Sequence, residues 1–147
     1  MKATDNPVVI EQVFNTSSRQ LWDALTNQNK MKFWFFDNMK TFVPEVGFET
    51  QFAVHVEERT FTHLWKITEV IPFKKITYNW KYEEYPGDSF VTFEIIEEEN
   101  QARLKLTMKI VEDFPDDIPE FSRESCLGGW NYFLKENLYN YFNSQTQ

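Results

Sequence analysis

The stretch FTHLWKIT (residues 61–68), followed by ITYNWKYE (residues 76–83), decides the fold of this chain. In both stretches a large side chain, mostly apolar or aromatic, stands at every second position, and most of the residues between are polar. Because successive side chains of a strand point to opposite faces of a sheet, this alternation predicts strands with one buried face and one wet face. Such one-sided strands are typical of antiparallel sheets.

The same period of two extends on both sides of the quoted stretches, from Gly47 to Ile110. Turn-forming residues interrupt it at Pro72, at residues 86–88 (Pro-Gly-Asp) and at residues 99–100 (Glu-Asn). The region is therefore predicted to contain five strands, at about residues 48–57, 61–68, 76–83, 91–95 and 103–110.

The residues before Gly47 predict one more strand and two short helices. The segment Val8–Phe14 is rich in β-branched residues, which favour strands. Ser17 followed three residues later by Gln20 fits a capping box, and apolar residues at helical spacing come directly after it. Asn27 is a suitable cap for a second short helix that would carry the apolar side chains of residues 31–34.

The last part of the chain predicts a long amphipathic helix at about residues 121–143, which residues 116–120 would open. Its predicted buried stripe consists of Leu127, Trp130, Leu134, Leu138 and Tyr141. A one-sided sheet needs a cover, and this helix is the only element large enough. The sequence thus predicts one α+β domain over residues 1–147, with a helix-grip fold. In it, a six-stranded curved antiparallel sheet wraps around the long C-terminal helix, and two short helices follow the first strand.

The composition excludes several classes of site. The chain has 147 residues, of which 15 are Phe, 6 Tyr and 5 Trp, and so many aromatic residues are typical of a folded domain with a real core. Only four glycines are present, so neither the dinucleotide-binding nor the P-loop glycine motif can be formed. One cysteine and two histidines are too few for an internal disulfide or a Cys/His zinc site.

The charge and the hydropathy pattern set expectations about partners and location. A net charge of −8 disfavours nucleic acids, because binding them depends on neutralising phosphates. The acidic runs lie at strand ends and turns, where solvated surface is expected. The residues before Pro7 include no apolar signal region, and no apolar run is long enough to span a membrane. A cytoplasmic protein with Cys126 reduced is the resulting expectation.

Several short stretches, taken in order, carry a resemblance to known proteins. They are Val13–Thr26, Met31–Trp34, Pro44–Gly47, Ile67–Pro72 with Ile76–Trp80, and Gly129-Trp130. Their order and spacing resemble the START-like, Bet v 1-like superfamily, and within it the family named after the activator of Hsp90 ATPase. The resemblance covers roughly residues 8 to 143. Phe48 departs from it by replacing a second glycine, and Met108 stands where many members have a polar residue, often histidine.

The resemblance implies a groove or cavity between the sheet and the C-terminal helix. It implies a non-enzymatic domain that binds a small hydrophobic molecule there, or a protein partner such as a chaperone. The alternative is an enzyme of the polyketide cyclase or dehydratase type that uses the same cavity. No catalytic residue, metal ligand or cofactor is predicted. The predicted ligand-binding residues are His63, Trp65, Tyr78, Trp80, Phe93, Met108, Trp130 and Leu134.

Each candidate also has an ordinary structural interpretation. The aromatic set could simply be a close-packed core, and a cavity above about 300 Å³ would distinguish a pocket from such packing. His63 is either a ligand anchor or acid/base group, or a buried histidine bonded to a carbonyl or a tyrosine. Cys126 is expected to be a small buried thiol. The pair Gly128-Gly129 marks close helix–sheet approach, a late helix start or a portal beside the pocket.

Overall fold

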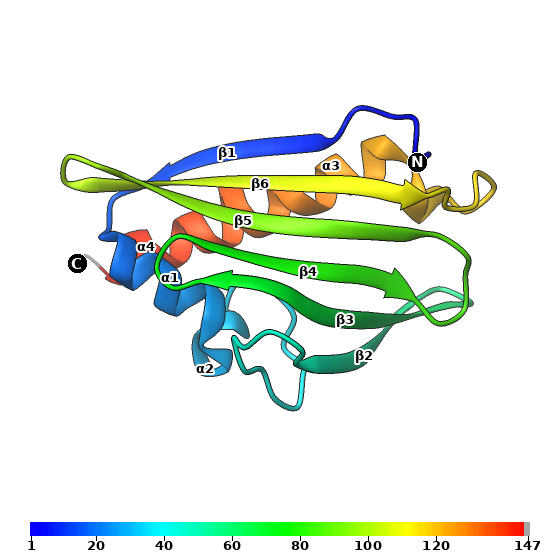
Figure 1. Ribbon diagram of the computed structural model, residues 1–147, viewed down its shortest axis with the longest axis horizontal. Coiled ribbons are helices and arrows are strands. Elements are labelled where there is room, and N and C mark those ends of the chain that lie inside the picture. Colours follow the sequence, from blue (N-terminus) through cyan, green and yellow to red (C-terminus); the bar gives the residue numbers. More distant parts are fainter. Residues whose placement is uncertain (146–147) are drawn as a thin grey trace.

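The computed structural model describes residues 1–145, so the last two residues of the predicted 1–147 domain lie outside the described residues. Six strands form one antiparallel sheet in the order β1-β6-β5-β4-β3-β2 (Figure 1). The strands are β1 (Val8–Phe14), β2 (Glu49–Val56), β3 (Arg59–Ile71), β4 (Lys75–Tyr82), β5 (Asp88–Glu98) and β6 (Gln101–Glu112). The six-stranded sheet, its pairing and its curvature confirm the predicted fold class.

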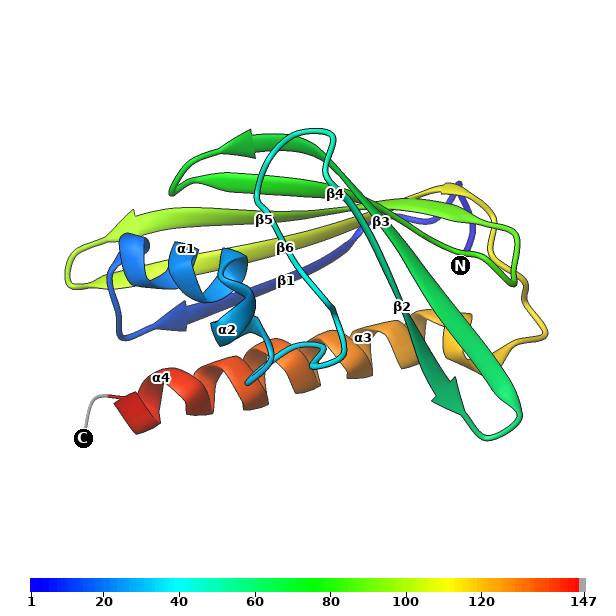
Figure 2. The same ribbon diagram turned by 90° about the horizontal axis from the view of Figure 1, so that it is seen from below.

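The register between β3 and β4 shows why the alternation was informative. Trp65 lies opposite Trp80, and His63 lies opposite Tyr82. All four side chains therefore share one face of the sheet, and this face is buried apart from the half-buried Tyr82. His55, which has the opposite parity, is exposed as expected. The face that carries the aromatic residues is the one that covers the C-terminal helix (Figure 2).

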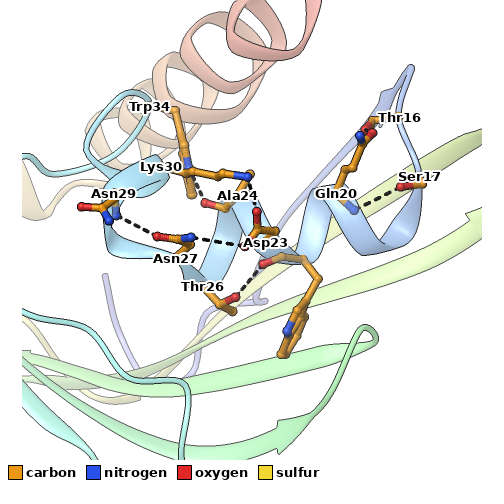
Figure 3. A network of polar contacts seen from close by, with 11 residues as sticks. Thr16, Ser17, Gln20, Asp23, Ala24, Thr26, Asn27, Asn29, Lys30 and Trp34 are labelled. Carbon is orange, nitrogen blue, oxygen red and sulfur yellow. Dashed lines mark hydrogen bonds and ion pairs between the residues drawn. The ribbon is translucent and has the colours of Figure 1, made fainter. Parts of the chain in front are cut away.

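The first helix, α1 (Ser18–Thr26), begins where the capping pattern predicts. The Ser17 hydroxyl oxygen accepts a hydrogen bond from the Gln20 backbone N–H at 3.1 Å (Figure 3). The Gln20 side chain does not complete the capping box, because its Oε1 accepts from the Thr16 hydroxyl at 2.7 Å. The helix start is thus tied to the chain before it as well as to its own cap.

The second helix, α2 (Gln28–Met31), is shorter than the sequence suggested. Asn27 caps it as predicted, through a side-chain oxygen that accepts from the Asn29 N–H at 3.0 Å. Trp34, expected within the helix, lies in the turn after it, and its indole N–H donates to the Ala24 carbonyl at 2.8 Å (Figure 3). This bond and the burial of Trp34 hold the turn against α1.

The C-terminal helix runs diagonally beneath the sheet (Figure 2). Its parts are the 3₁₀ turn η1 (Pro119–Phe121), α3 (Arg123–Asn131), the π-helical segment η2 (Tyr132–Leu138) and α4 (Tyr139–Gln145). The α-helix starts after the acidic segment expected to open it, because Ser122 is the cap and accepts from the Ser125 N–H at 3.1 Å. Among the described residues, no helix is both long and apolar enough to cross a membrane.

The π-helical segment alters the buried stripe of this helix. Of the predicted stripe, Trp130, Leu134 and Leu138 are buried, whereas Leu127 and Tyr141 are half-buried and packed against the core. Phe142, which was not predicted, ends the fully buried stripe. In an ideal α-helix each step of four residues overshoots a full turn by about 40°, and three such steps would turn Phe142 away from Trp130. A π segment has more residues per turn, which cancels this drift and keeps all four side chains against the sheet.

Candidate functional site

A cavity of about 290 Å³ lies between the sheet and α3. This volume falls just below the roughly 300–1,000 Å³ range of ligand pockets, so it does not pass the threshold of about 300 Å³ that would separate a pocket from close packing. Because several lining side chains are only half-buried, the cavity reaches the surface. Aromatic and aliphatic residues make up most of the lining. The lining residues are Met1, Phe36, Val54, Val56, Phe61, His63, Trp80, Tyr82, Met108, Phe114, Glu120, Phe121, Cys126, Gly129, Trp130 and Phe133.

Four of the eight predicted ligand-binding residues line this cavity: His63, Trp80, Met108 and Trp130. They come from three different strands and from α3, so only the folded chain brings them together. Trp80 and Trp130 contact each other edge to face, with ring centroids 5.5 Å apart. These two rings connect the sheet to the helix at the inner end of the cavity.

The other four predicted residues, Trp65, Tyr78, Phe93 and Leu134, are buried but do not line the cavity. The segment of residues 32–48, which joins α2 to β2 (Figure 2), packs aromatic side chains against part of this set. Its Phe35 lies 5.5 Å from Trp65 and 6.3 Å from Phe93, between ring centroids.

Phe42 of the same segment lies 5.7 Å from Tyr78, again between ring centroids. Side chains of this segment thus occupy the space beside Trp65, Tyr78 and Phe93. The neighbouring Phe36 forms part of the cavity wall.

His63 is the most deeply buried ionisable group of the cavity lining, with 6% of its surface exposed. Its Nδ1 lies 3.0 Å from the Phe61 carbonyl oxygen, which can only accept, so Nδ1 carries the proton and Nε2 is an acceptor. Burial lowers the pKa of His63 from 6.5 to about 4, more than the bond to Phe61 raises it. The imidazole is therefore neutral near pH 7.

Tyr82 is a second polar group of the cavity, and it was not among the predicted site residues although it shares the parity of Tyr78 and Trp80. The indole N–H of Trp80 donates to the Tyr82 hydroxyl oxygen at 2.9 Å. The hydroxyl hydrogen of Tyr82 is not used in this bond. Burial raises the pKa of Tyr82, so the hydroxyl stays protonated and can donate.

Cys126 lines the cavity from α3 and is half-buried. Its Sγ lies 3.4 Å from Met108 Sδ, a weak S–H contact between two soft side chains. Burial raises the pKa of the Cys126 thiol to about 11. The thiol is therefore protonated near neutral pH and a poor nucleophile. It is less buried than the fully buried thiol expected from the sequence.

The rim of the cavity carries an ion pair. Arg59 at the β2–β3 turn contacts Glu120 of η1 through Nε to Oε1 at 2.8 Å and through Nη2 to Oε2 at 2.7 Å. The hydrogen bond from Arg59 lowers the pKa of Glu120, which keeps this carboxylate ionised. Among the described residues that line the cavity there is no lysine or arginine, but the lining includes Met1, whose N-terminal ammonium donates to the Phe121 carbonyl at 3.0 Å.

The two adjacent glycines in α3, Gly128 and Gly129, differ in their position relative to the cavity. A β-carbon added at Gly129 would meet no atom within 4 Å, and Gly129 lines the cavity. Gly128 also has open space around it, but it is exposed and outside the lining. Close approach of helix and sheet is therefore the wrong explanation for the pair. Gly129 lies at the cavity instead, the position expected of a portal.

A third glycine, Gly87, leaves room for the Phe114 ring, which lines the cavity. Gly87 has a φ of +117°, and a β-carbon there would lie 2.3 Å from Phe114 Cδ1. Any side chain at this turn would displace the Phe114 ring, which packs 5.1 Å from Phe121. The turn between β4 and β5 thereby shapes one side of the cavity.

The chemistry of the cavity is apolar binding with two directional polar groups, His63 and Tyr82. No group of three or more His, Cys, Asp or Glu side chains suited to a metal occurs within residues 1–145. The absence of a metal requirement stays a prediction.

Comparisons with known proteins agree with this architecture. Protein CV1439 of Chromobacterium violaceum superposes with a TM-score of 0.76 at 19% identity, over 93% of this chain and 96% of that one. PFC0360w, an HSP90 activator from Plasmodium falciparum, gives 0.65 at 22% identity, over 89% and 92%. DynU16, a protein of the dynemicin biosynthetic locus, gives 0.73 at 15% identity, over 96% of this chain and 48% of that one. At such identities these likenesses establish the fold.

Sequence comparison identifies the family. A comparison with curated proteins found no match. The sequence model of the family described as "Activator of Hsp90 ATPase homolog 1-like protein" matches residues 15–143, which include the five strands β2 to β6 and nearly the whole C-terminal helix but not β1. The chain therefore belongs to the Activator of Hsp90 ATPase homolog 1-like family of START-like proteins.

Proposed function

We propose that this protein binds a small hydrophobic molecule in the cavity between the sheet and α3, without converting it. The observation that carries the proposal is an open, mostly apolar cavity of about 290 Å³ between the sheet and α3, lined largely by aromatic and aliphatic side chains. An apolar molecule that enters it leaves water for a lining of rings and aliphatic groups, which is the main driving force of such binding.

The protonation states of the cavity support binding over catalysis. A catalytic acid or base works best with a pKa near the working pH. The pKa of His63 is lowered to about 4, that of Cys126 is raised to about 11, and that of Tyr82 is raised above its ordinary value. Near pH 7 none of the three exchanges a proton readily. The cyclase-type alternative would need at least one such group.

A protein partner is the other function that the family suggests, because the Plasmodium falciparum relative of similar fold is an HSP90 activator. A partner could contact the same face of the domain, and the two activities need not exclude each other. Stimulation of Hsp90 ATPase by the purified protein would test this role directly. Binding of a small molecule in the cavity is the more specific of the two hypotheses.

The binding proposal can be tested with naphthalene, a rigid apolar probe, by equilibrium dialysis. The adjacent glycines provide a matched pair of variants. Gly129→Leu places a side chain at the cavity, whereas Gly128→Leu places the same side chain in solvent. Both remove a helical glycine, so both change helix propensity equally.

We expect naphthalene to bind the wild-type protein and Gly128→Leu alike, and Gly129→Leu at least about tenfold more weakly. Absence of binding to the wild-type protein, or equal loss in both variants, would contradict the proposal. Incubation of the protein with a cyclisable polyketide and analysis of products tests the enzyme alternative, for which a product that disappears in His63→Gln would be decisive.

A further inference from the structure

Two polar groups face each other across neighbouring strands of the cavity. His63 and Tyr82 are register partners of β3 and β4, and their ring centroids lie 4.8 Å apart. Both side chains line the cavity. A single ligand atom placed beside one of them is therefore close to the other.

The existing hydrogen bonds fix what each of the two groups can still offer. Tyr82 uses its oxygen to accept from the Trp80 indole N–H, so its own hydrogen remains available. His63 uses its Nδ1–H to donate to Phe61, so Nε2 remains as an acceptor. Within residues 1–145 neither the Tyr82 hydrogen nor His63 Nε2 has a partner. One donor and one acceptor, side by side, are thus left to a ligand.

The charged groups at the cavity already have partners. Glu120 belongs to the lining, and both of its carboxylate oxygens accept from Arg59. Met1 also belongs to the lining, and its N-terminal ammonium donates to the Phe121 carbonyl at 3.0 Å. Recognition of a polar group on the ligand is therefore expected at the neutral pair of His63 and Tyr82.

We infer that the cavity selects an aromatic molecule with one hydroxyl group, a phenol or a related polycyclic alcohol. The ligand hydroxyl oxygen accepts from the Tyr82 O–H, and its hydrogen is donated to His63 Nε2. This inference rests on the proposed binding function and adds the chemical class of the ligand.

The aromatic character follows from the shape and composition of the walls. Trp80, Trp130 and Phe36 present ring surfaces to the cavity, and Phe133 adds another from η2. Flat aromatic molecules gain offset-stacked and edge-to-face contacts with such walls beyond the gain from apolar burial. A volume of about 290 Å³ suits a compact two-ring or three-ring ligand better than a long acyl chain.

Two probes of nearly equal shape isolate the contribution of the hydroxyl: naphthalene and 2-naphthol. Equilibrium dialysis against the wild-type protein at pH 7 compares no polar group with a neutral hydroxyl on one scaffold. We expect 2-naphthol to bind about tenfold more tightly than naphthalene, the gain of one or two net hydrogen bonds.

Each other result has a distinct meaning. If naphthalene binds as tightly as 2-naphthol, the inference about the hydroxyl is wrong while the binding function stands. If neither probe binds, both the binding function and this inference fail.

A pair of variants assigns the hydroxyl recognition to a residue. Tyr82→Phe removes the donor, and the affinity ratio of 2-naphthol to naphthalene should fall to about threefold or less. Tyr85→Phe makes the same chemical change at a tyrosine outside the cavity lining, 5.2 Å from Phe121 between ring centroids. There the ratio should stay at the wild-type value. An unchanged ratio in Tyr82→Phe would overturn the assignment of Tyr82.

Discussion

The guanidinium of Arg59 and the carboxylate of Glu120 form a two-point contact between the β2–β3 turn and the start of the C-terminal helix, with N–O distances of 2.8 and 2.7 Å. The two residues are 61 positions apart in sequence. Their contact joins an edge hairpin of the sheet to the helix at the rim of the cavity. The pair therefore restricts the movement by which the hairpin could separate from the helix.

Removal of this contact should affect ligand exchange more than stability. We expect Arg59→Ala to raise the dissociation rate of naphthalene about threefold or more, because side chains near the surface contribute little to folding but here restrain the rim. Stopped-flow fluorescence measures the rate. As a control, Arg103→Ala breaks a comparable ion pair with Glu98. Neither Arg103 nor Glu98 lines the cavity, so this variant should leave the dissociation rate unchanged. Equal rates in all three proteins would show that the pair does not restrain the rim.

Trp130 should be a main anchor of the C-terminal helix. It is 5% exposed and contacts the rings of Trp80 and Phe93, with centroids 5.5 and 5.9 Å apart. Trp130→Ala should lower the free energy of unfolding by roughly 3–5 kcal/mol, measured by urea denaturation. Tyr132→Ala, at a residue 54% exposed on the same helix, should cost below about 0.5 kcal/mol. A loss below about 1 kcal/mol at Trp130 would contradict its anchoring role.

Acidification should destabilise the protein through His63. The folded protein keeps this imidazole neutral down to about pH 4, whereas the unfolded chain binds a proton near its ordinary pKa of 6.5. Between these values the unfolded state holds more protons, so stability falls as pH falls. The free energy of unfolding should decrease by roughly 3 kcal/mol over this window because of His63. Urea denaturation of wild type and His63→Gln at several pH values isolates the effect, and parallel profiles would rule it out.

Cys126 can report on occupancy of the cavity, because it is the only cysteine and it belongs to the lining. With a thiol pKa of about 11, its reaction with a disulfide reagent should be slow at pH 7 and should accelerate as pH rises toward that value. Saturating naphthalene should slow the reaction at least about threefold by covering the thiol. Fast labelling that naphthalene does not change would place Cys126 outside the ligand's reach.

The strands could be predicted because their evidence is local. Phe61, Trp65 and Ile67 are buried, and Thr62 and Lys66 are not, as alternation requires. Helix ends were less accurate, since a cap depends on one side chain: Ser122, and not the acidic residues before it, starts α3. These errors move boundaries without changing the fold.

The extent of the cavity could not be predicted from the sequence, because it depends on what the connecting segments fill. Phe35 and Phe42 belong to a segment whose apolar residues follow neither helical nor strand periodicity. No sequence pattern therefore indicated that they would pack against Trp65 and Tyr78. The parity of Tyr82 with Trp80 was a usable signal for a lining residue, and it was overlooked. Sequence patterns give the face of each residue, whereas empty volume is a property of the whole packed fold.

The π-helical segment η2 lies between a helical part that lines the cavity and a part that packs near β1, where Phe142 contacts Phe14 with ring centroids 5.6 Å apart. Deletion of one residue between Leu134 and Leu138 would leave buried spacings of four, three and four, which an ordinary α-helix accommodates. The chain can therefore lose a residue here without turning Phe142 from its partner. A single-residue deletion at this position should therefore preserve both the cavity and the contact between Phe14 and Phe142.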